Sequence, residues 1–143
     1  MNKNICAEVR ILSNLIRRKT LCGAEIEEMG KITGGHGYII AFLSENSNKN
    51  VYQRDIEKHF KIRRSTVTAT LHRMEKNGVI TRVSDASDSR LKRIILTDKG
   101  LELFKNFKIK ADAIENQISS VLSEEESKQF IELIKKLQKG AEG

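Results

Sequence analysis

Residues 60–97, FKIRRSTVTATLHRMEKNGVITRVSDASDSRLKRIILT, decide the fold of this chain. They predict a short amphipathic helix with a basic leading end, followed by a strand, a charged loop and a second strand. A helix of this size fits the major groove of DNA, and the hairpin after it is typical of a β-wing. Residues 53–93 hold 11 Lys and Arg against 5 Asp and Glu, a net charge of +6, whereas the whole chain carries +7. Nearly all the basic excess lies on this stretch.

The composition favours a soluble domain with a nucleic acid or another anionic surface as its partner. A chain of 143 residues can bury a core without disulfides or metals. No apolar run approaches the roughly 18 residues of a membrane span, and the N-terminal sequence MNKNICAEVRILSN becomes polar too soon for a signal peptide. We therefore expect a cytoplasmic location, no membrane partner, and a basic surface that attracts phosphate.

Helices are predicted on both sides of the deciding stretch. Apolar residues at spacings of 3, 4 and 7 predict one long helix over residues 3–29, and Thr33 is the expected N-cap of a helix that ends near Glu45. Residues 51–62 and 64–77 form two short helices around a turn at Lys61, which is the pattern of a helix-turn-helix. Gly78 should end the second helix in the left-handed conformation.

The C-terminal third predicts two strands and two helices. Strands are expected over residues 79–83 and 91–96, and Thr97 should cap a long helix whose apolar seam runs from Phe104 to Val121. Ser123, followed by Glu124 to Glu126, forms a capping box for the last helix. The fold class is thus mainly α with a small β-wing (α+β).

The outer helices carry more apolar surface than a winged helix of about 60 residues can cover. The net charges of residues 1–33 (+2) and 94–143 (−1) do not oppose association. We predict a homodimer in which residues 1–33 and 98–143 form the helical dimerisation region. Residues 34–97 then form the winged helix-turn-helix that binds DNA.

Cys6 and Cys22 both fall in the helix predicted over residues 3–29. In one helix they would lie about 24 Å apart and point about 160° apart, so no disulfide within the chain is expected. Neither has the spacing of a zinc site, and no metal or other cofactor is expected. Two interpretations stay open, namely small buried hydrophobic residues and a redox-sensing Cys6.

The chain resembles the MarR family of bacterial transcriptional regulators over essentially its full length. The resemblance is carried by RSTVTATLHRMEKNGVI (64–80), DASDSR (85–90) and LTDKG (96–100) in that order. The resemblance implies a winged-helix homodimer that binds a pseudo-palindromic operator, most often as a repressor. It also implies that the protein leaves the DNA when it binds a small aromatic or phenolic compound, or when it is oxidised. Two features depart from the family: Arg63 replaces the usual Asp or Ser cap of the recognition helix, and TGGHGY lacks the paired tyrosines of the peroxide sensors.

The DNA-contact candidates share a basic or polar side chain on the predicted helix-turn-helix or wing. Hydroxyls and N–H groups at a helix start suit phosphates or base edges, and an Arg fork suits guanine O6 and N7, although base and phosphate contacts stay undecided. By resemblance, Arg90 enters the minor groove while Asp88 orients it. The alternative for each is a solvated surface residue. The candidates are Gln53, Arg54, Arg63, Arg64, Ser65, Thr66, Thr68, His72, Arg73, Asp88, Arg90, Lys92 and Arg93.

Arg17, His36 and Tyr38 are the candidates for an effector pocket, because the family's pocket usually lies on the first two helices; each is otherwise structural or exposed. TGGHG (33–37) lacks the pattern of a phosphate loop, and no catalytic motif is present, so we expect no enzyme. The alternatives are a DNA-coating architectural protein, a thiol-redox regulator acting through Cys6, an enzyme acting on nucleotides, and a winged-helix regulator of another family.

Overall fold

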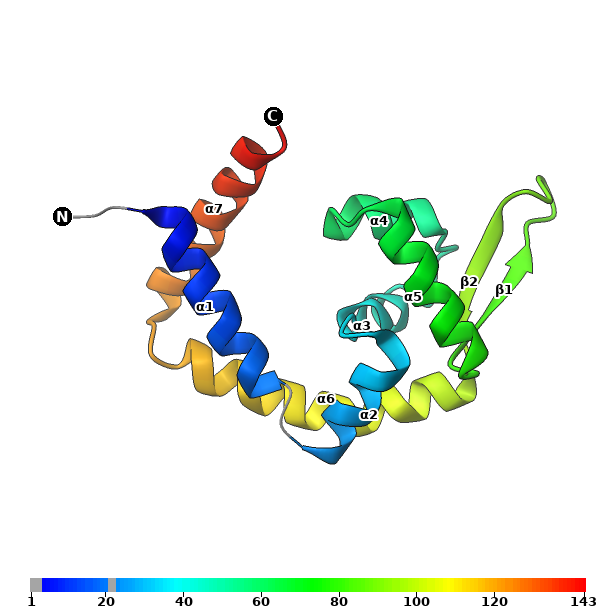
Figure 1. Cartoon of the computed structure of the whole chain (residues 1–143), viewed down its shortest axis with the longest axis horizontal. Coiled ribbons are helices and arrows are strands. Elements are labelled where there is room, and N and C mark those ends of the chain that lie inside the picture. Colours follow the sequence, from blue (N-terminus) through cyan, green and yellow to red (C-terminus); the bar gives the residue numbers. More distant parts are fainter. Residues whose placement is uncertain (1–3, 21–22) are drawn as a thin grey trace. The chain divides into compact units, whose positions relative to one another are not determined.

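The computed structural model describes residues 4–20 and 23–143 of the chain (Figure 1). The predicted mainly α fold with a small β-wing is confirmed. In chain order the elements are α1 (Ile5–Thr20), α2 (Ala24–Thr33), α3 (Tyr38–Glu45), α4 (Gln53–Phe60), α5 (Arg64–Lys76), β1 (Ile80–Ser84), β2 (Lys92–Leu96), α6 (Asp98–Ser119) and α7 (Glu124–Ala141).

The chain divides into two compact units, Met1–Ile109 and Lys110–Gly143. The core of the first unit is apolar and draws on α2 to α6, both strands, Val51 before α4 and Val79 before β1. Because Met29 and Ile32 of α2 are buried in it, α2 packs as part of the winged helix rather than only as an outer helix. The dimerisation role of residues 1–33 and 98–143 stays a prediction. The buried core residues are Met29, Ile32, Ile39, Ile40, Leu43, Val51, Ile56, Val67, Leu71, Met74, Val79, Ile80, Ile94 and Leu103.

Helices α4 and α5 form the predicted helix-turn-helix. Lys61 lies between them with φ 55°, a left-handed conformation that turns the chain. Val67, Leu71 and Met74 of α5 are fully buried, which confirms the predicted inward stripe. Gly78 follows α5 with φ 75°, also as predicted. The opposite side of α5 is exposed and carries mostly polar and charged side chains.

The wing is an antiparallel hairpin of β1 and β2, paired from Ile80 with Leu96 to Ser84 with Lys92. Ile94 donates its N–H to the carbonyl of Val51 (2.8 Å), so the segment that enters α4 lies alongside β2. At the end of the hairpin the Thr97 hydroxyl accepts a hydrogen bond from the N–H of Gly100 (3.1 Å), which confirms the predicted cap of α6. These bonds fix the hairpin to the helix-turn-helix and to α6.

Two predictions about the N-terminal helices are wrong. Residues 3–29 do not form one helix, because α1 ends at Thr20 and Gly23, with φ 104°, precedes α2. The separation of the two cysteines in one helix therefore does not apply, and Cys22 lies outside the described residues. Thr33 is the last residue of α2 and not an N-cap, since its hydroxyl donates to the carbonyl of Met29 (2.7 Å). Gly34 and Gly35 then turn the chain with positive φ.

The C-terminal helices match their prediction except at one end. α6 stops at Ser119, so Val121, which is 80% exposed, does not continue its seam. In the capping box of α7 the Ser123 hydroxyl accepts from the N–H of Glu126 (3.1 Å), and the Glu126 carboxylate accepts from the N–H of Ser123 (2.9 Å). Among the described residues, none of the helices combines the length and apolarity that a bilayer crossing requires.

Candidate nucleic-acid interface

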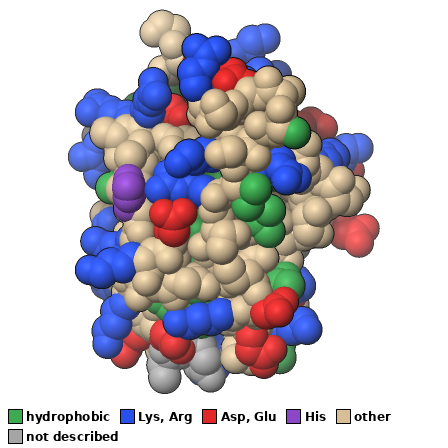
Figure 2. All heavy atoms as spheres, turned by 90° about the vertical axis from the view of Figure 1, so that its right-hand side faces the viewer, with side chains coloured by type: hydrophobic (Ala, Val, Ile, Leu, Met, Phe, Trp, Pro, Cys, Tyr) green, Lys and Arg blue, Asp and Glu red, His purple; other side chains and the backbone are tan. Residues whose placement is uncertain are grey.

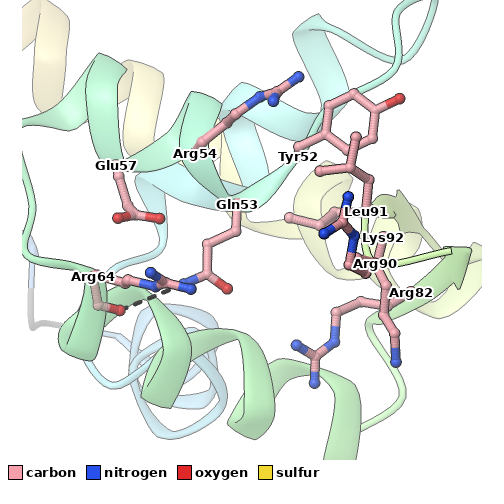
Figure 3. A pocket seen from close by; sticks show the side chains of 10 residues that line it. Tyr52, Gln53, Arg54, Glu57, Arg64, Arg82, Arg90, Leu91 and Lys92 are labelled. Carbon is pink, nitrogen blue, oxygen red and sulfur yellow. Dashed lines mark hydrogen bonds between the residues drawn. The ribbon is translucent and has the colours of Figure 1, made fainter. Parts of the chain in front are cut away.

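A groove of about 400 Å³ runs between the helix-turn-helix and the wing (Figure 3). α4 and α5 form one side and the hairpin forms the other. Five cationic side chains line it against the single carboxylate of Glu57, so the groove attracts anions. The lining residues are Tyr52, Gln53, Arg54, Glu57, Arg64, Arg82, Arg90, Leu91, Lys92 and Ile94.

On the helical side, Arg64 is the first residue of α5 and is exposed to solvent. Arg63 before it is extended and makes no side-chain cap, as the sequence predicted. The N–H groups of Arg64 and Ser65 can therefore donate to an acceptor, whereas that of Thr66 already donates to the Arg63 carbonyl (3.1 Å). Gln53 reaches across from α4 and donates to the Thr68 hydroxyl (2.7 Å). The predicted residues Gln53 and Thr68 thus bind each other and fasten α4 to α5.

On the wing side, Asp88 holds Arg90. The Arg90 guanidinium donates to both Asp88 carboxylate oxygens (3.2 Å each), and the backbone N–H of Arg90 donates to the same carboxylate (3.0 Å). These bonds hold the pKa of Asp88 below its usual value, the side-chain bond having the largest effect. The Arg90 side chain remains 89% exposed. The pair presents a charged, oriented guanidinium at the wing tip.

Arg82 is a groove residue that sequence reasoning missed. Its guanidinium donates to both carboxylate oxygens of Glu75 on α5 (3.1 Å each), which joins β1 to the recognition helix. The bond from Arg82 lowers the pKa of Glu75. Residues two apart on a strand lie on the same face. The sequence could therefore have placed Arg82 on the face of the hairpin that holds the buried Ile80. Tyr52, Glu57 and Leu91 were missed as well, and no sequence motif marks them.

The remaining DNA candidates do not line this groove. Ser65, Thr66 and Arg73 line a separate hollow of about 380 Å³ together with His36. His72 is exposed, and with Arg73 it lines a third hollow beside Lys76.

Arg93 also lies apart from the groove. Its guanidinium donates to the Asn50 side chain (3.3 Å) and lines another pocket, whereas its neighbour Lys92 faces the groove. Successive residues of a strand point to opposite faces, so only one of these two cations can enter.

Of the three candidates for an effector pocket, two contact each other and the third lies elsewhere. His36 and Tyr38 contact each other through Nδ1 and the hydroxyl, and the Tyr38 ring packs on Phe60 of α4 with ring centroids 4.6 Å apart. Burial raises the pKa of Tyr38. Arg17 instead donates to Asn14 within α1 (2.9 Å).

Cys6 is exposed on α1. Within the described residues there is no group of three or more His, Cys, Asp or Glu side chains that could hold a metal ion.

On the hairpin side of the molecule, Lys and Arg side chains are spread over the whole visible face, with Asp and Glu side chains among them (Figure 2). A helix-turn-helix, a β-wing and a cationic groove between them together define a winged-helix protein of the DNA-binding class.

Comparison with known proteins gives the family. The model of the MarR family matches residues 31–91. The transcription regulator MarR from Oenococcus oeni PSU-1 is 31% identical, with 95% of this chain and 99% of that chain covered and a TM-score of 0.79. The chain belongs to the MarR family of transcriptional regulators, which are DNA-binding transcription factors and not enzymes.

Two further relatives are similar along most of their length. The HTH-type transcriptional regulator BilQ of Clostridioides difficile (strain CD3) is 28% identical over 121 residues, which cover 85% of this chain and 80% of BilQ. S. aureus MepR in its complex with DNA is 28% identical, with 97% of this chain and 99% of that chain covered and a TM-score of 0.83. The similarity therefore extends beyond the winged helix to the outer helices.

Proposed function

We propose that this protein is a homodimeric repressor that binds a pseudo-palindromic operator in double-stranded DNA and leaves it when a small aromatic or phenolic ligand binds. The observation that carries the proposal is the groove between α5 and the wing, where Arg64 and Arg90 face the same space from two elements. The structure of MepR with DNA supports it, since that relative has the same fold.

In this proposal each subunit binds DNA with two elements. The start of α5 enters the major groove, where the Arg64 guanidinium and the backbone N–H groups of Arg64 and Ser65 donate to base edges or phosphates. Arg90, oriented by Asp88, enters the adjoining minor groove, and Arg54 and Lys92 contact phosphates between them. Gln53 and Thr68 act indirectly, because their mutual bond sets the angle between α4 and α5.

The homodimer follows from apolar surface that each unit leaves exposed. In α1, Ile5, Ile11 and Leu15 are all more than half exposed, and in α7 Leu133 is 55% exposed. Exposed apolar side chains that recur along a helix mark an association site in a soluble protein. Two copies joined through these helices would place two α5 helices in successive major grooves, about 34–36 Å apart.

Selection of fragments from the source genome tests the DNA-binding part. The purified protein should retain a small set of duplexes that share an inverted repeat, and excess bulk DNA should not displace them in a gel shift. An architectural protein that coats DNA would lose its preference under the same competition. That outcome would replace the repressor proposal by the architectural one.

The ligand part rests on His36 and Tyr38, whose polar atoms meet beside the Phe60 ring. A carboxylate or phenol beside an aromatic wall could bind there by hydrogen bonding and stacking. Benzoate and phenol are suitable probes, added to the protein–operator complex in a gel shift. The proposal is supported if either probe releases the operator from wild type and releases less of it from His36→Ala. It is contradicted if neither probe releases the operator at millimolar concentration.

A further inference from the structure

Tyr52 joins the entry of α4 to the wing loop. It is the N-cap residue of α4, and its hydroxyl donates a hydrogen bond to the carboxylate of Asp85, 33 residues further along the chain. Asp85 is the first residue after β1, so the bond forms where the paired strands end. Of the contacts between the α4 entry and the hairpin, it is nearer to the wing tip than those of Val51 and Asn50.

The same carboxylate organises the loop itself. Its other oxygen accepts hydrogen bonds from the backbone N–H of Ser87 (2.9 Å) and from the Ser87 hydroxyl (2.7 Å). The N–H of Asp85 donates to the carbonyl of Leu91 (2.8 Å), which closes the loop. Hydrogen bonds from Tyr52 and Ser87 hold the pKa of Asp85 down at about 2, so the acceptor is ionised at neutral pH. Asp85 therefore links the loop that carries Arg90 to Tyr52.

The Tyr52 ring also contacts one cation of the groove. The guanidinium carbon of Arg54 lies 5.1 Å from the ring centroid, which is a cation–π distance. Arg54 and Tyr52 line the helical side of the groove, and Arg90 lines the wing side (Figure 3). Tyr52 thus contacts Arg54 of α4 directly and is linked through Asp85 to the loop that carries Arg90.

We propose that Tyr52 is a positioning residue for DNA binding, whose hydroxyl acts through Asp85 to fix the wing loop and Arg90 relative to α4. The inference rests on the proposed function and adds a residue to it. Without this bond the loop stays closed on itself but moves relative to α5, and Arg90 spends less time where the minor groove requires it. The consequence is a weaker complex from an unchanged set of DNA contacts.

Tyr52→Phe is the discriminating variant, because it keeps the ring and its contact with Arg54 while it removes the hydroxyl. In the free protein, hydrogen exchange of amides in residues 85–91 should accelerate about fivefold to tenfold, as expected for one lost hydrogen bond, and that of Ile94 should not change. Ser47→Ala, which removes an exposed hydroxyl from the loop after α3, is the control and should leave both unchanged.

A double-mutant cycle with Arg90→Ala tests the route of the effect. On the selected operator, Tyr52→Phe should weaken binding about fivefold to tenfold when Arg90 is present, and by less than about twofold in the Arg90→Ala background. A residue that only stabilised the fold would weaken both backgrounds equally. Equal losses, or no loss with Arg90 present, overturn this inference alone. A wild-type protein that retains no duplex overturns the proposed function as well.

Discussion

Arg64 stands at the start of the recognition helix, where the groove meets solvent. If its guanidinium reads a guanine, Arg64→Ala should reduce affinity for the selected operator by about 1–3 kcal/mol and relax specificity at one base pair of each half-site. Binding measurements on operators with single base changes give both quantities. Lys49→Ala removes the same charge from the loop after α3, outside the groove lining, and serves as control. A loss that is equal for all operator variants would assign Arg64 to a phosphate instead.

Arg90 differs from Arg64 because its exposed guanidinium is oriented by Asp88 at the wing tip. A cation in the minor groove displaces counterions, so Arg90→Ala should lower affinity and reduce the slope of log K against log salt by about 1. Titrations between low and moderate salt measure the slope. Asp88→Asn keeps the Arg90 charge but weakens its orientation, and should lower affinity with little change of slope. An unchanged slope in Arg90→Ala would place this side chain away from DNA.

Asp85 gives a pH prediction at the same scale. Its pKa in the folded protein is about 2, below the usual 3.8 of an aspartate, so its carboxylate contributes stability above pH 3.8 that is lost as pH falls toward 2. Asp85→Asn should therefore be less stable than wild type near pH 6, and the difference should shrink as pH falls from about 4 to 2. Denaturant unfolding at several pH values measures this. A constant difference over that range would contradict the depressed pKa.

Among the elements, α6 begins against the wing with no room for a side chain. A Cβ on Gly100 would lie 2.3 Å from the carbonyl oxygen of Val79, a backbone atom that cannot move aside cheaply. Gly100→Ala should lower the free energy of unfolding by about 1–3 kcal/mol or more. Gly30→Ala in α2 is the matched control, since a Cβ there meets nothing within 4 Å and should raise stability by up to about 1 kcal/mol. Thermal and denaturant unfolding compare the two, and equal effects would contradict the packing argument.

The elements also show what the sequence could predict. The stripe Val67, Leu71 and Met74 predicted α5, because the spacing of buried residues directly reflects helix geometry. The break at Gly23 was missed because apolar spacing continues across it and one glycine costs a helix only about 1 kcal/mol. Thr33 was misassigned because a threonine hydroxyl can cap a following helix or bond to a carbonyl of its own turn.

The candidate site was predicted unevenly for a similar reason. Charge located the groove, and the wing motif located Arg90 with Asp88. Tyr52 with Asp85, and Arg82 with Glu75, are pairs whose members meet only after folding, and neither pair has a local sequence pattern. Charge alone predicted the same role for Lys92 and Arg93, although they are neighbours on one strand and therefore line different pockets. Contacts between elements therefore required the structure.

For the whole molecule, operator binding and dimerisation should depend on each other. Phe130, Leu133 and Leu137 form an exposed apolar face on α7, and a buried carboxylate in a dimer interface is strongly unfavourable. Leu133→Glu should shift the protein from dimer to monomer at micromolar concentration in sedimentation experiments. Because a monomer reaches only one half-site, operator affinity should fall by two orders of magnitude or more, about the lower bound expected from losing linked binding.

Lys139→Glu is the control for this loss, because at about 100° per residue it places the same carboxylate on the opposite face of α7. It should remain dimeric and keep its operator affinity. If wild type is itself monomeric at micromolar concentration, or if monomeric Leu133→Glu binds the full operator as tightly as wild type, two linked recognition helices are not needed. Binding would then come from one basic groove, and the operator need not contain an inverted repeat.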